Sequence, residues 1–311
     1  MEQHSAALCA VAERARAAGC AVAFDEPMAR HTTMRVGGAA DLFVTAPDAA
    51  GACAVLSAGK AAGVPVTLVG NGSDLIVGDR GIRGAVLRLA AQPPVLLPDG
   101  IHVQCDAGTT LSALCVFARD RGLAGLEFAY GIPGTLGGAL FMNAGAYGGE
   151  IADVTETVQA VTFGGAALTV PAADMAFGYR HSAAQGRTGD ERLLFTAATL
   201  RLSPDDPAAI AARMDDYMQR RRDKQPLEYP SAGSFFRRPA GHFAGALIEQ
   251  AGLKGCRIGG AAVSGKHAGF VVNLGGATAA DLTALSAHVR ERVLAHSGVE
   301  LTPEVRFIGE F

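Results

Sequence analysis

Several features that would assign this chain of 311 residues to a particular class of protein are missing from it. Its six cysteines form no CxxC pair and none has the spacing of a metal clamp, so we expect reduced, buried thiols. The eight histidines form no HxH, HxxxH or HExxH pattern, and no metal site is expected. With 27 basic and 30 acidic residues, the chain lacks the basic excess of a nucleic-acid-binding protein.

Long apolar segments are also missing. No apolar run reaches the roughly 18 residues that a membrane-spanning helix needs. Glu13, Arg14 and Arg16 interrupt the apolar residues near the N-terminus, where a signal peptide would need an uncharged core. We therefore expect a cytoplasmic protein without a membrane anchor, and no motif indicates a required protein partner.

The composition is that of a folded protein, because 49% of the residues are hydrophobic and 18% are charged. At about 100 to 200 residues per domain, the length predicts two domains, with three small ones as the alternative. Glycine is in excess: 40 residues amount to about 13% of the chain, against a usual share of roughly 7%. Many backbone positions must therefore adopt a positive φ or lie close to another group.

Helical and strand-like patterns alternate along the first two hundred residues, which predicts an α+β fold. A long helix over 205–224 follows Ser203-Pro204, and we place the domain boundary there. The first domain is then 1–203 and the second is 204–311. The expected helices are 5–18, 48–62, 109–121, 205–224, 243–251 and 279–296, and the expected strands are 40–45, 64–69, 84–89, 101–105, 158–163, 193–202, 269–274 and 304–308.

The first of two glycine clusters, Gly70-Asn71-Gly72-Ser73-Asp74, follows a predicted strand. Successive small residues let backbone N–H groups converge on an anion such as a diphosphate. The loop is not a Rossmann fingerprint, because Leu75 stands where the third glycine of GxGxxG belongs. A turn without a ligand is the simpler alternative.

The second cluster runs from Gly131 to Glu150 and could place a flat or phosphorylated ligand against bare backbone. The alternative is a loop packed on a helix. Two clusters about sixty residues apart suit one long ligand with a diphosphate and an aromatic ring system. The candidate cofactor-binding residues are Gly70, Asn71, Gly72, Ser73, Asp74, Gly131, Ile132, Pro133, Gly134, Thr135, Gly138, Asn143 and Ala144.

Two further patterns have simpler explanations than function. The stretch from Gly260 to Lys266 matches a Walker A loop except that His267 replaces the Ser or Thr that holds Mg²⁺, so we expect no ATP site. The basic run 220–224 lies at a predicted helix C-terminus, where cations are favoured, and we interpret it as a solvated helix end.

Three separate residues are the candidate catalytic groups. Ser234 lies between small residues and two phenylalanines, which would expose its hydroxyl and anchor the loop. Arg180 and Glu304 are charged residues within short motifs. Taken alone, Ser234 would be a turn residue, and Arg180 and Glu304 would be surface charges.

Seven blocks, in order, make the chain resemble the UDP-N-acetylenolpyruvoylglucosamine reductases, flavoenzymes that complete UDP-N-acetylmuramate for bacterial peptidoglycan. The blocks are 33–43, 70–77, 125–150, 179–182, 230–239, 263–273 and 303–309. The resemblance implies that 1–203 is an FAD-binding part of the vanillyl-alcohol-oxidase-like type, with two α+β subdomains that meet near residue 100. It also implies that 204–311 is a smaller α+β substrate-binding domain. The short interval between Arg180 and Ser234 resembles the subclass that lacks an inserted tyrosine loop, and Asp74 and Gly265 depart from the usual Asn and acidic residue.

The resemblance also implies the chemistry. NADPH would reduce a noncovalently bound FAD, and hydride would then reach the enolpyruvyl double bond of the UDP-sugar. Arg180 would meet the developing negative charge, because a guanidinium pairs with a carboxylate in a planar fork. Glu304 would be protonated or would orient Arg180, and Ser234 would deliver the proton.

The sequence holds no second dinucleotide motif. The resemblance implies that NADPH uses the same flavin face as the substrate, before it. On charge and on their place in the second domain, Arg238, Lys254 and His267 are the candidate residues for the substrate diphosphate. The alternatives are an FAD-dependent alcohol or lactone oxidase or dehydrogenase of the same flavin fold, which often tethers its flavin covalently, and an inactive nucleotide-binding module.

Overall fold

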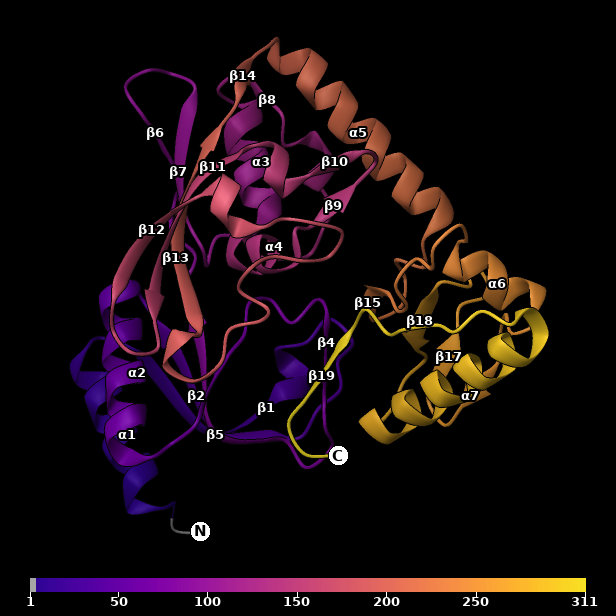
Figure 1. Ribbon diagram of the computed structural model, residues 1–311, viewed down its shortest axis with the longest axis horizontal. Coiled ribbons are helices and arrows are strands. Elements are labelled where there is room, and N and C mark those ends of the chain that lie inside the picture. The colour runs from indigo at the N-terminus through magenta and orange to yellow at the C-terminus, as the bar shows by residue number, and fades with distance from the viewer. Residues whose placement is uncertain (1–3) are drawn as a thin grey trace. The chain divides into compact units, whose positions relative to one another are not determined.

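The computed structural model describes residues 4–311 and divides them into two compact units (Figure 1). Unit 1 contains the described residues up to Phe24 together with Leu42–Asn71 and Gly84–Gln219, and unit 2 contains Asp25–Asp41, Gly72–Arg83 and Arg220–Phe311. This differs from a single boundary at residue 203. Two short segments group with the C-terminal part because Met34, Val36 and Ile76 are buried in its hydrophobic core.

The first part of unit 1 combines two helices with strands of a four-stranded sheet of order β1-β2-β5-β3. Its elements are α1 (Ala6–Ala17), β1 (Ala21–Pro27), β2 (Ala39–Ala46), α2 (Ala49–Ala62), β3 (Val66–Leu68) and β5 (Ile82–Leu89). The division between the units falls within β1, β2 and β5. Ser5 and Asp48 cap the two helices, as side-chain acceptors for the backbone N–H groups of Leu8 and Gly51. Both predicted helices are confirmed.

The second part of unit 1 contains an antiparallel sheet of order β12-β11-β13-β7-β6. Its strands are β6 (Val95–Leu96), β7 (His102–Asp106), β11 (Thr155–Thr162), β12 (Ala167–Pro171) and β13 (Leu193–Arg201). The helices α3 (Leu111–Arg119) and α4 (Leu136–Met142) contribute Leu114 and Leu140 to the same hydrophobic cluster as Val158 and Leu200. That cluster uses residues from 103 to 214, whereas a separate one uses residues from 8 to 87 with Leu194.

Short elements complete unit 1. They are β8 (Leu123–Ala124), β9 (Gly145–Ala146), β10 (Gly149–Glu150), β14 (Ser203–Pro204) and the 3-10 turns Glu127–Ala129, Ile151–Asp153, Ala172–Met175 and Gly189–Glu191. The long helix α5 (Pro207–Lys224) continues past the division at Gln219. Arg213 on α5 bonds to the buried Glu127 carboxylate at 2.7 Å, which ties the helix to the rest of unit 1.

Unit 2 contains a four-stranded sheet of order β15-β18-β17-β16 and two helices. The elements are the 3-10 turn Met28–Arg30, β4 (Leu75–Val77), β15 (Ser231–Ser234), α6 (Ala244–Gln250), β16 (Arg257–Ile258), β17 (Ala261–Val263), β18 (Phe270–Asn273), α7 (Ala279–Ser297) and β19 (Arg306–Ile308). Strand β19 pairs in parallel with β4, far away in sequence. Asp79 accepts hydrogen bonds from the first backbone N–H groups of α7, at 2.7 and 2.9 Å. The α+β class predicted from the sequence is confirmed.

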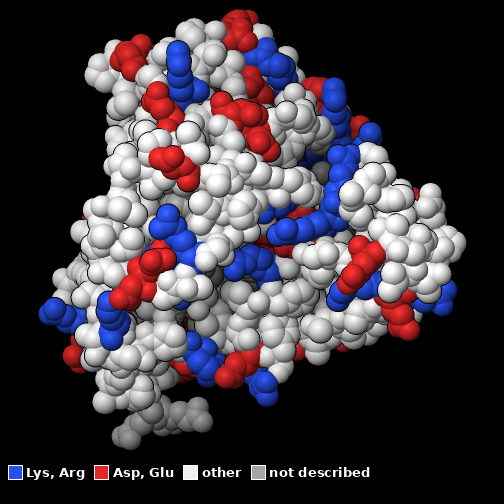
Figure 2. Space-filling view, in the orientation of Figure 1, with Lys and Arg blue, Asp and Glu red and all other residues white. Residues whose placement is uncertain are grey.

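No helix among residues 4–311 has the length and apolar content to cross a membrane. Charged side chains of both signs appear on the face drawn in Figure 2. This mixture agrees with the small net charge of −3.

Candidate functional site

The two glycine clusters meet inside unit 1, between the residues after β3 and the start of α4. The side-chain amide of Asn71 donates to the carbonyl oxygen of Pro133 at 2.6 Å. A Cβ built on Gly70 would lie 2.6 Å from the hydroxyl oxygen of Thr135, which itself accepts from the N–H of Gly138 to cap α4. The two clusters are therefore in direct contact, and the absence of a side chain at Gly70 leaves room for Thr135.

The other residues of the second cluster have several different contacts within unit 1. Gly134 accepts a backbone hydrogen bond from α3, and Ile132 and Ala144 pack on the core of unit 1. Asn143 is fully buried; its amide nitrogen donates to the Gly178 carbonyl at 3.0 Å, and its amide oxygen accepts from Ala152 at 3.1 Å. The side chain that we expected to bind cofactor therefore has internal partners.

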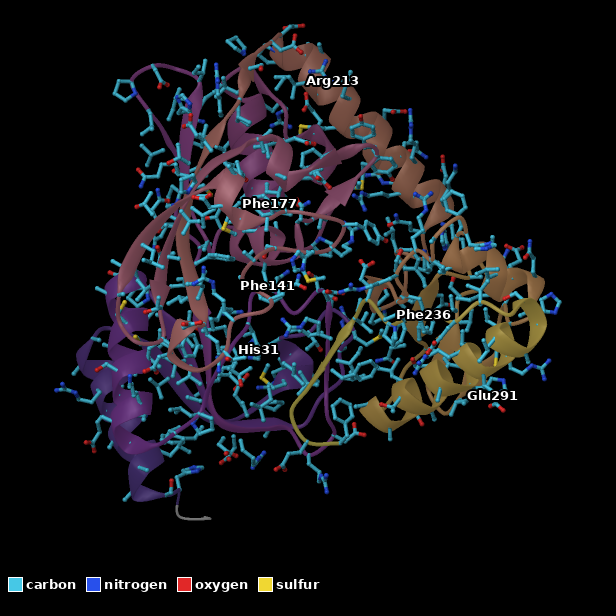
Figure 3. The ribbon with its side chains drawn as sticks, in the orientation of Figure 1. His31, Phe141, Phe177, Arg213, Phe236 and Glu291 are labelled. Carbon is cyan, nitrogen blue, oxygen red and sulfur yellow. The ribbon has the colours of Figure 1, made fainter. Side chains whose placement is uncertain are left out.

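The remaining part of the first cluster belongs to unit 2. Gly72 has a φ of +62°, and a Cβ built there would lie 2.0 Å from the carbonyl oxygen of His31, which is labelled in Figure 3. The backbone N–H of Thr33 bonds to the Gly72 carbonyl at 3.2 Å, and that of Arg306 bonds to the Asp74 carbonyl at 3.0 Å. Glycine is thus required at position 72 by the chain's own packing, a reason that the sequence did not reveal.

Arg180 lies in unit 1 on a tight turn and is half-buried. Its φ is +53°, a conformation that is uncommon for residues other than glycine. The guanidinium donates to the carbonyl oxygen of Gly145 at 3.2 Å and lies 5.3 Å from the ring centroid of Tyr179. Tyr147, two residues after Gly145, stacks on Tyr217 with ring centroids 4.7 Å apart.

Ser234 and Glu304 are brought together by backbone pairing in unit 2. Ser234 ends β15, pairs with Phe270 of β18 and is exposed. The next residue, Phe235, accepts a backbone hydrogen bond from Glu304 at 2.9 Å, and Phe236 bridges to Pro303. Phe235 and Phe236 are buried, so the expectation that these two rings anchor the serine loop is confirmed.

The three candidate diphosphate residues lie in unit 2 with different partners. Arg238 stacks over the exposed ring of Phe243, at 3.9 Å from its centroid. Lys254 forms an ion pair of 2.6 Å with Glu249, an acidic residue that the sequence analysis did not single out. Burial, followed by the charge of Lys254, lowers the pKa of His267, whose Nδ1 accepts from the N–H of Gly269 at 3.1 Å.

The Walker-like stretch from Gly260 to Lys266 and the basic run 220–224 both lie in unit 2. Residues 261–263 form a strand, and Lys266 lies in the hairpin before β18, where its ammonium donates to the Arg222 carbonyl at the end of α5. The next element after this lysine is the strand β18, whereas a helix follows the lysine of a phosphate-binding loop. Within the basic run Arg221 is only 7% exposed, so the interpretation as a solvated helix end is wrong for that residue.

All six cysteines are free thiols, as expected. Cys20, Cys105 and Cys115 are buried, and the other three are half-buried. Burial raises the pKa of Cys105 and of Cys115 to about 12. Neutral buried thiols of this kind are structural and unreactive.

Two cavities lie away from the candidate catalytic residues. One, of about 500 Å³, is in unit 1 and is lined by Pro47, Asp48, Gln92, Pro93, Val95, Gln104 and Asp106. The other, of about 300 Å³, is in unit 2 and is lined by Glu228, Tyr229, Gly255, Ala262, Val263, Ser264, Gly265, Lys266, Val272 and Leu274.

Comparison with known protein families matches two regions of the chain. Residues 40–170 match the family described as an FAD binding domain, and residues 225–308 match the C-terminal domain of UDP-N-acetylenolpyruvoylglucosamine reductase. The predicted combination of an FAD-binding part and a smaller C-terminal domain is thereby confirmed.

Individual relatives match almost the whole chain. A UDP-N-acetylenolpyruvoylglucosamine reductase of Levilactobacillus brevis is 47% identical over 286 residues, covering 92% of each chain. One of Geobacter metallireducens is 45% identical over 287 residues, covering 92% of this chain and 93% of its own. The crystal structure of the reductase from Thermus caldophilus has a TM-score of 0.77 and 34% identity, covering 93% of this chain and 98% of that one. These names do not favour the oxidase alternative.

Proposed function

Because the chain belongs to the UDP-N-acetylenolpyruvoylglucosamine reductase family, we propose that it reduces the enolpyruvyl group of UDP-N-acetylenolpyruvoylglucosamine to give UDP-N-acetylmuramate for peptidoglycan synthesis. The observation that carries this proposal is similarity to reductases along 92% of the chain, covering both units. FAD is the cofactor and NADPH the reductant. We also propose that the protein is cytoplasmic, because NADPH and nucleotide sugars are cytoplasmic metabolites.

The glycine-rich segments fit a noncovalently bound FAD. Glycine at position 70 lets Thr135 approach closely, and Asn71 joins the two segments through the Pro133 carbonyl. We propose that Gly70, Asn71, Ser73 and the segment from Gly131 to Gly138 contact FAD. FAD, when bound, accepts hydride from NADPH and passes it to the substrate carbon.

Arg180 is proposed to bind the carboxylate of the enolpyruvyl group. Hydride addition to the terminal carbon places negative charge on the neighbouring carbon and its carboxylate. A guanidinium remains charged near neutral pH and offers two parallel N–H donors to a carboxylate. Arg180 stabilises the charge that develops during the reaction.

Ser234 is proposed to donate the proton, and Glu304 to polarise the reacting group. The exposed Ser234 hydroxyl is placed by β15 and by the buried Phe235, whose carbonyl pairs with the backbone of Glu304. A hydroxyl is a weak acid, yet a carbanionic intermediate is a strong base, so a positioned hydroxyl suffices. After transfer, the serine alkoxide regains its proton through neighbouring groups.

Unit 2 is proposed to bind the UDP part of the substrate through Arg238, Lys254 and His267. Two are permanent cations, and the neutral His267 can donate from Nε2, since its Nδ1 accepts a backbone hydrogen bond.

The first experiment mixes purified protein anaerobically with NADPH and follows the visible spectrum. We expect bleaching of a flavin absorbance near that of free FAD, and recovery of the absorbance when UDP-N-acetylenolpyruvoylglucosamine is added. Flavin that is reduced by NADPH but never reoxidised by this substrate would contradict the proposed function.

The residue assignment is tested with Ser234→Ala. We expect NADPH to reduce the flavin at a near-normal rate, because that half-reaction protonates no substrate carbon. Reoxidation by the substrate should slow by about 10²- to 10⁴-fold, the range for positioned acid–base groups. Ser231→Ala, on the same strand, is the matched control and should behave like the unaltered protein. Equal slowing of both half-reactions in Ser234→Ala would remove this serine from the mechanism.

A further inference from the structure

Arg180 lies in a turn whose backbone conformation is unfavourable for this residue. Gly178 and His181 exchange two backbone hydrogen bonds of 3.1 Å, which leaves Tyr179 and Arg180 as the two central residues of a tight hairpin turn. Arg180 has a φ of +53° there, and a residue with a Cβ pays in conformational energy for that region. The turn therefore needs support from outside itself.

That support comes from the carboxyl end of α4. The side-chain amide of Gln185 donates to two carbonyl oxygens, that of Phe141 at 2.9 Å and that of Arg180 itself at 3.1 Å. The hydroxyl of Ser182 donates to the same Phe141 oxygen at 2.8 Å. Phe141 is labelled on α4 in Figure 3. An amide nitrogen carries two hydrogens, so Gln185 can serve both carbonyl oxygens and join the arginine backbone to α4. The sulfur of Met142, also on α4, is a further acceptor at 3.6 Å.

Asn143, immediately after α4, completes the connection. Its amide nitrogen donates to the Gly178 carbonyl at 3.0 Å, at the first residue of the turn. Asn143 and Ser182 are both fully buried, so water does not replace these bonds readily. The guanidinium of Arg180 bonds to Gly145, two residues after Asn143. The backbone and the side chain of Arg180 are thus held by one segment of unit 1.

We propose that Gln185 is a positioning residue for the reaction, which acts through Arg180 and is assisted by Ser182 and Asn143. The proposal rests on the proposed function, since it assigns a purpose to the placement of Arg180. Without the Gln185 amide, the Arg180 carbonyl loses this donor and the turn can relax toward negative φ, which moves the guanidinium. A displacement of about 1 Å at a reacting centre costs about 10²-fold in rate.

The experiment compares Gln185→Leu with Gln92→Leu. Gln92 is a matched control, because it is also a half-buried glutamine of unit 1 whose amide donates to a backbone carbonyl, that of Pro47 at 2.9 Å. In Gln185→Leu we expect reoxidation by the substrate to slow by about 10- to 100-fold, with flavin content and reduction by NADPH unchanged. Gln92→Leu should show neither effect. Slowing of both half-reactions in Gln185→Leu, or of neither, overturns the proposal.

A double-mutant cycle separates positioning from a direct role. If Gln185 acts through Arg180, then Gln185→Leu should change the rate less than twofold once Arg180→Ala is present. Full additivity of the two substitutions overturns the proposal. If Gln185→Leu does not fold, the isosteric Gln185→Glu takes its place, because a carboxylate offers no donor to the two carbonyls.

Hydrogen exchange provides a readout that does not depend on the reaction. The backbone amides of Gly178 and His181 should exchange at least tenfold faster in Gln185→Leu than in Gln92→Leu, because the two backbone bonds of the turn open more often. Unchanged exchange overturns the positioning role. If the unaltered protein does not turn over the enolpyruvyl substrate, the proposed function fails, whereas this measurement still decides whether Gln185 holds the turn.

Discussion

The two units hold their proposed catalytic groups by different means. In unit 1, Arg180 lies in a turn with a positive φ that accepts hydrogen bonds from the side chains of Gln185 and Asn143. Ser182, just after the turn, donates to the Phe141 carbonyl of α4. In unit 2, Ser234 and Glu304 are placed by backbone pairing and by the buried ring of Phe235.

The difference separates two kinds of sensitivity to substitution. A group held by polar side chains can be displaced by one substitution while the rest of its unit stays folded. A group held by backbone pairing over a hydrophobic core is displaced only when that core is damaged, because the paired backbone atoms are the same for every sequence. Substitutions that displace a catalytic group without replacing it should therefore reduce activity alone in unit 1, and activity together with stability in unit 2.

The largest effect is expected from Phe235→Ala. This ring is 0% exposed and contacts Phe236 and Phe307, with centroids 5.2 and 6.3 Å away. Removing a buried phenylalanine side chain costs about 3 to 5 kcal/mol. We expect urea denaturation to show this loss for unit 2, with activity lost in parallel. Leu294→Ala, at a position 48% exposed on α7, is the control and should change the free energy of unfolding little. A stable but inactive Phe235→Ala protein would break the comparison.

Arg180→Lys should have the next largest effect, on rate and not on stability. Lysine keeps the charge but lacks the planar fork and cannot reproduce both the Gly145 hydrogen bond and a paired contact with a carboxylate. We expect reoxidation by the substrate to slow by about 10²-fold while the midpoint of urea denaturation stays constant. Arg187→Lys, a half-buried residue in the same segment, should leave the rate unchanged. A full rate in Arg180→Lys would show that charge alone is sufficient.

A smaller effect is expected from Glu249→Gln. The Glu249 carboxylate pairs with Lys254 at 2.6 Å and would repel a diphosphate bound by that lysine. Exposed pairs of this type contribute up to about 1 kcal/mol, so KM for the UDP-sugar should fall by about two- to fivefold with kcat unchanged. Glu291→Gln, an exposed position on α7 that is labelled in Figure 3, is the control. A rise in KM would mean that the ion pair orients Lys254 for the substrate.

The smallest effect is expected on the pH dependence of stability, through the side-chain contacts of His102 in unit 1. His102 lies between Asp99, at 2.6 Å, and Glu156, at 3.1 Å. The hydrogen bond to Asp99 raises the pKa of His102, so its stabilising effect is fully present below the ordinary value near 6.5 and is lost as pH rises through the raised value. The same bond lowers the pKa of Asp99 to about 2, so that its contribution is lost as pH falls toward that value.

Thermal unfolding of His102→Gln and of the unaltered protein should test this effect. The difference in Tm should be largest between about pH 4 and pH 6.5, where both partners are charged, and should shrink at higher pH. His288→Gln, on α7 of unit 2, serves as the control for loss of a histidine. A Tm difference that does not vary with pH would assign His102 a packing role instead.

Local sequence patterns were sufficient for most of the secondary structure. The predicted helices at 5–18, 48–62, 243–251 and 279–296 are within two residues of α1, α2, α6 and α7, because apolar spacing and capping residues act over a few residues. Strand β4 was missed. It has only three residues, and its partner β19 lies more than two hundred residues further along the chain.

The sequence by itself determined the class of fold, the glycine-rich segments and the identity of the candidate groups, because these depend on residue type and local order. The tertiary structure decided how the groups are held. Nothing in the local pattern relates Gln185 to α4, pairs Glu249 with Lys254 or requires glycine at position 72 beside His31. Each of these follows from atoms that are brought within a few ångströms only when the chain folds, and no periodicity or motif records such distances.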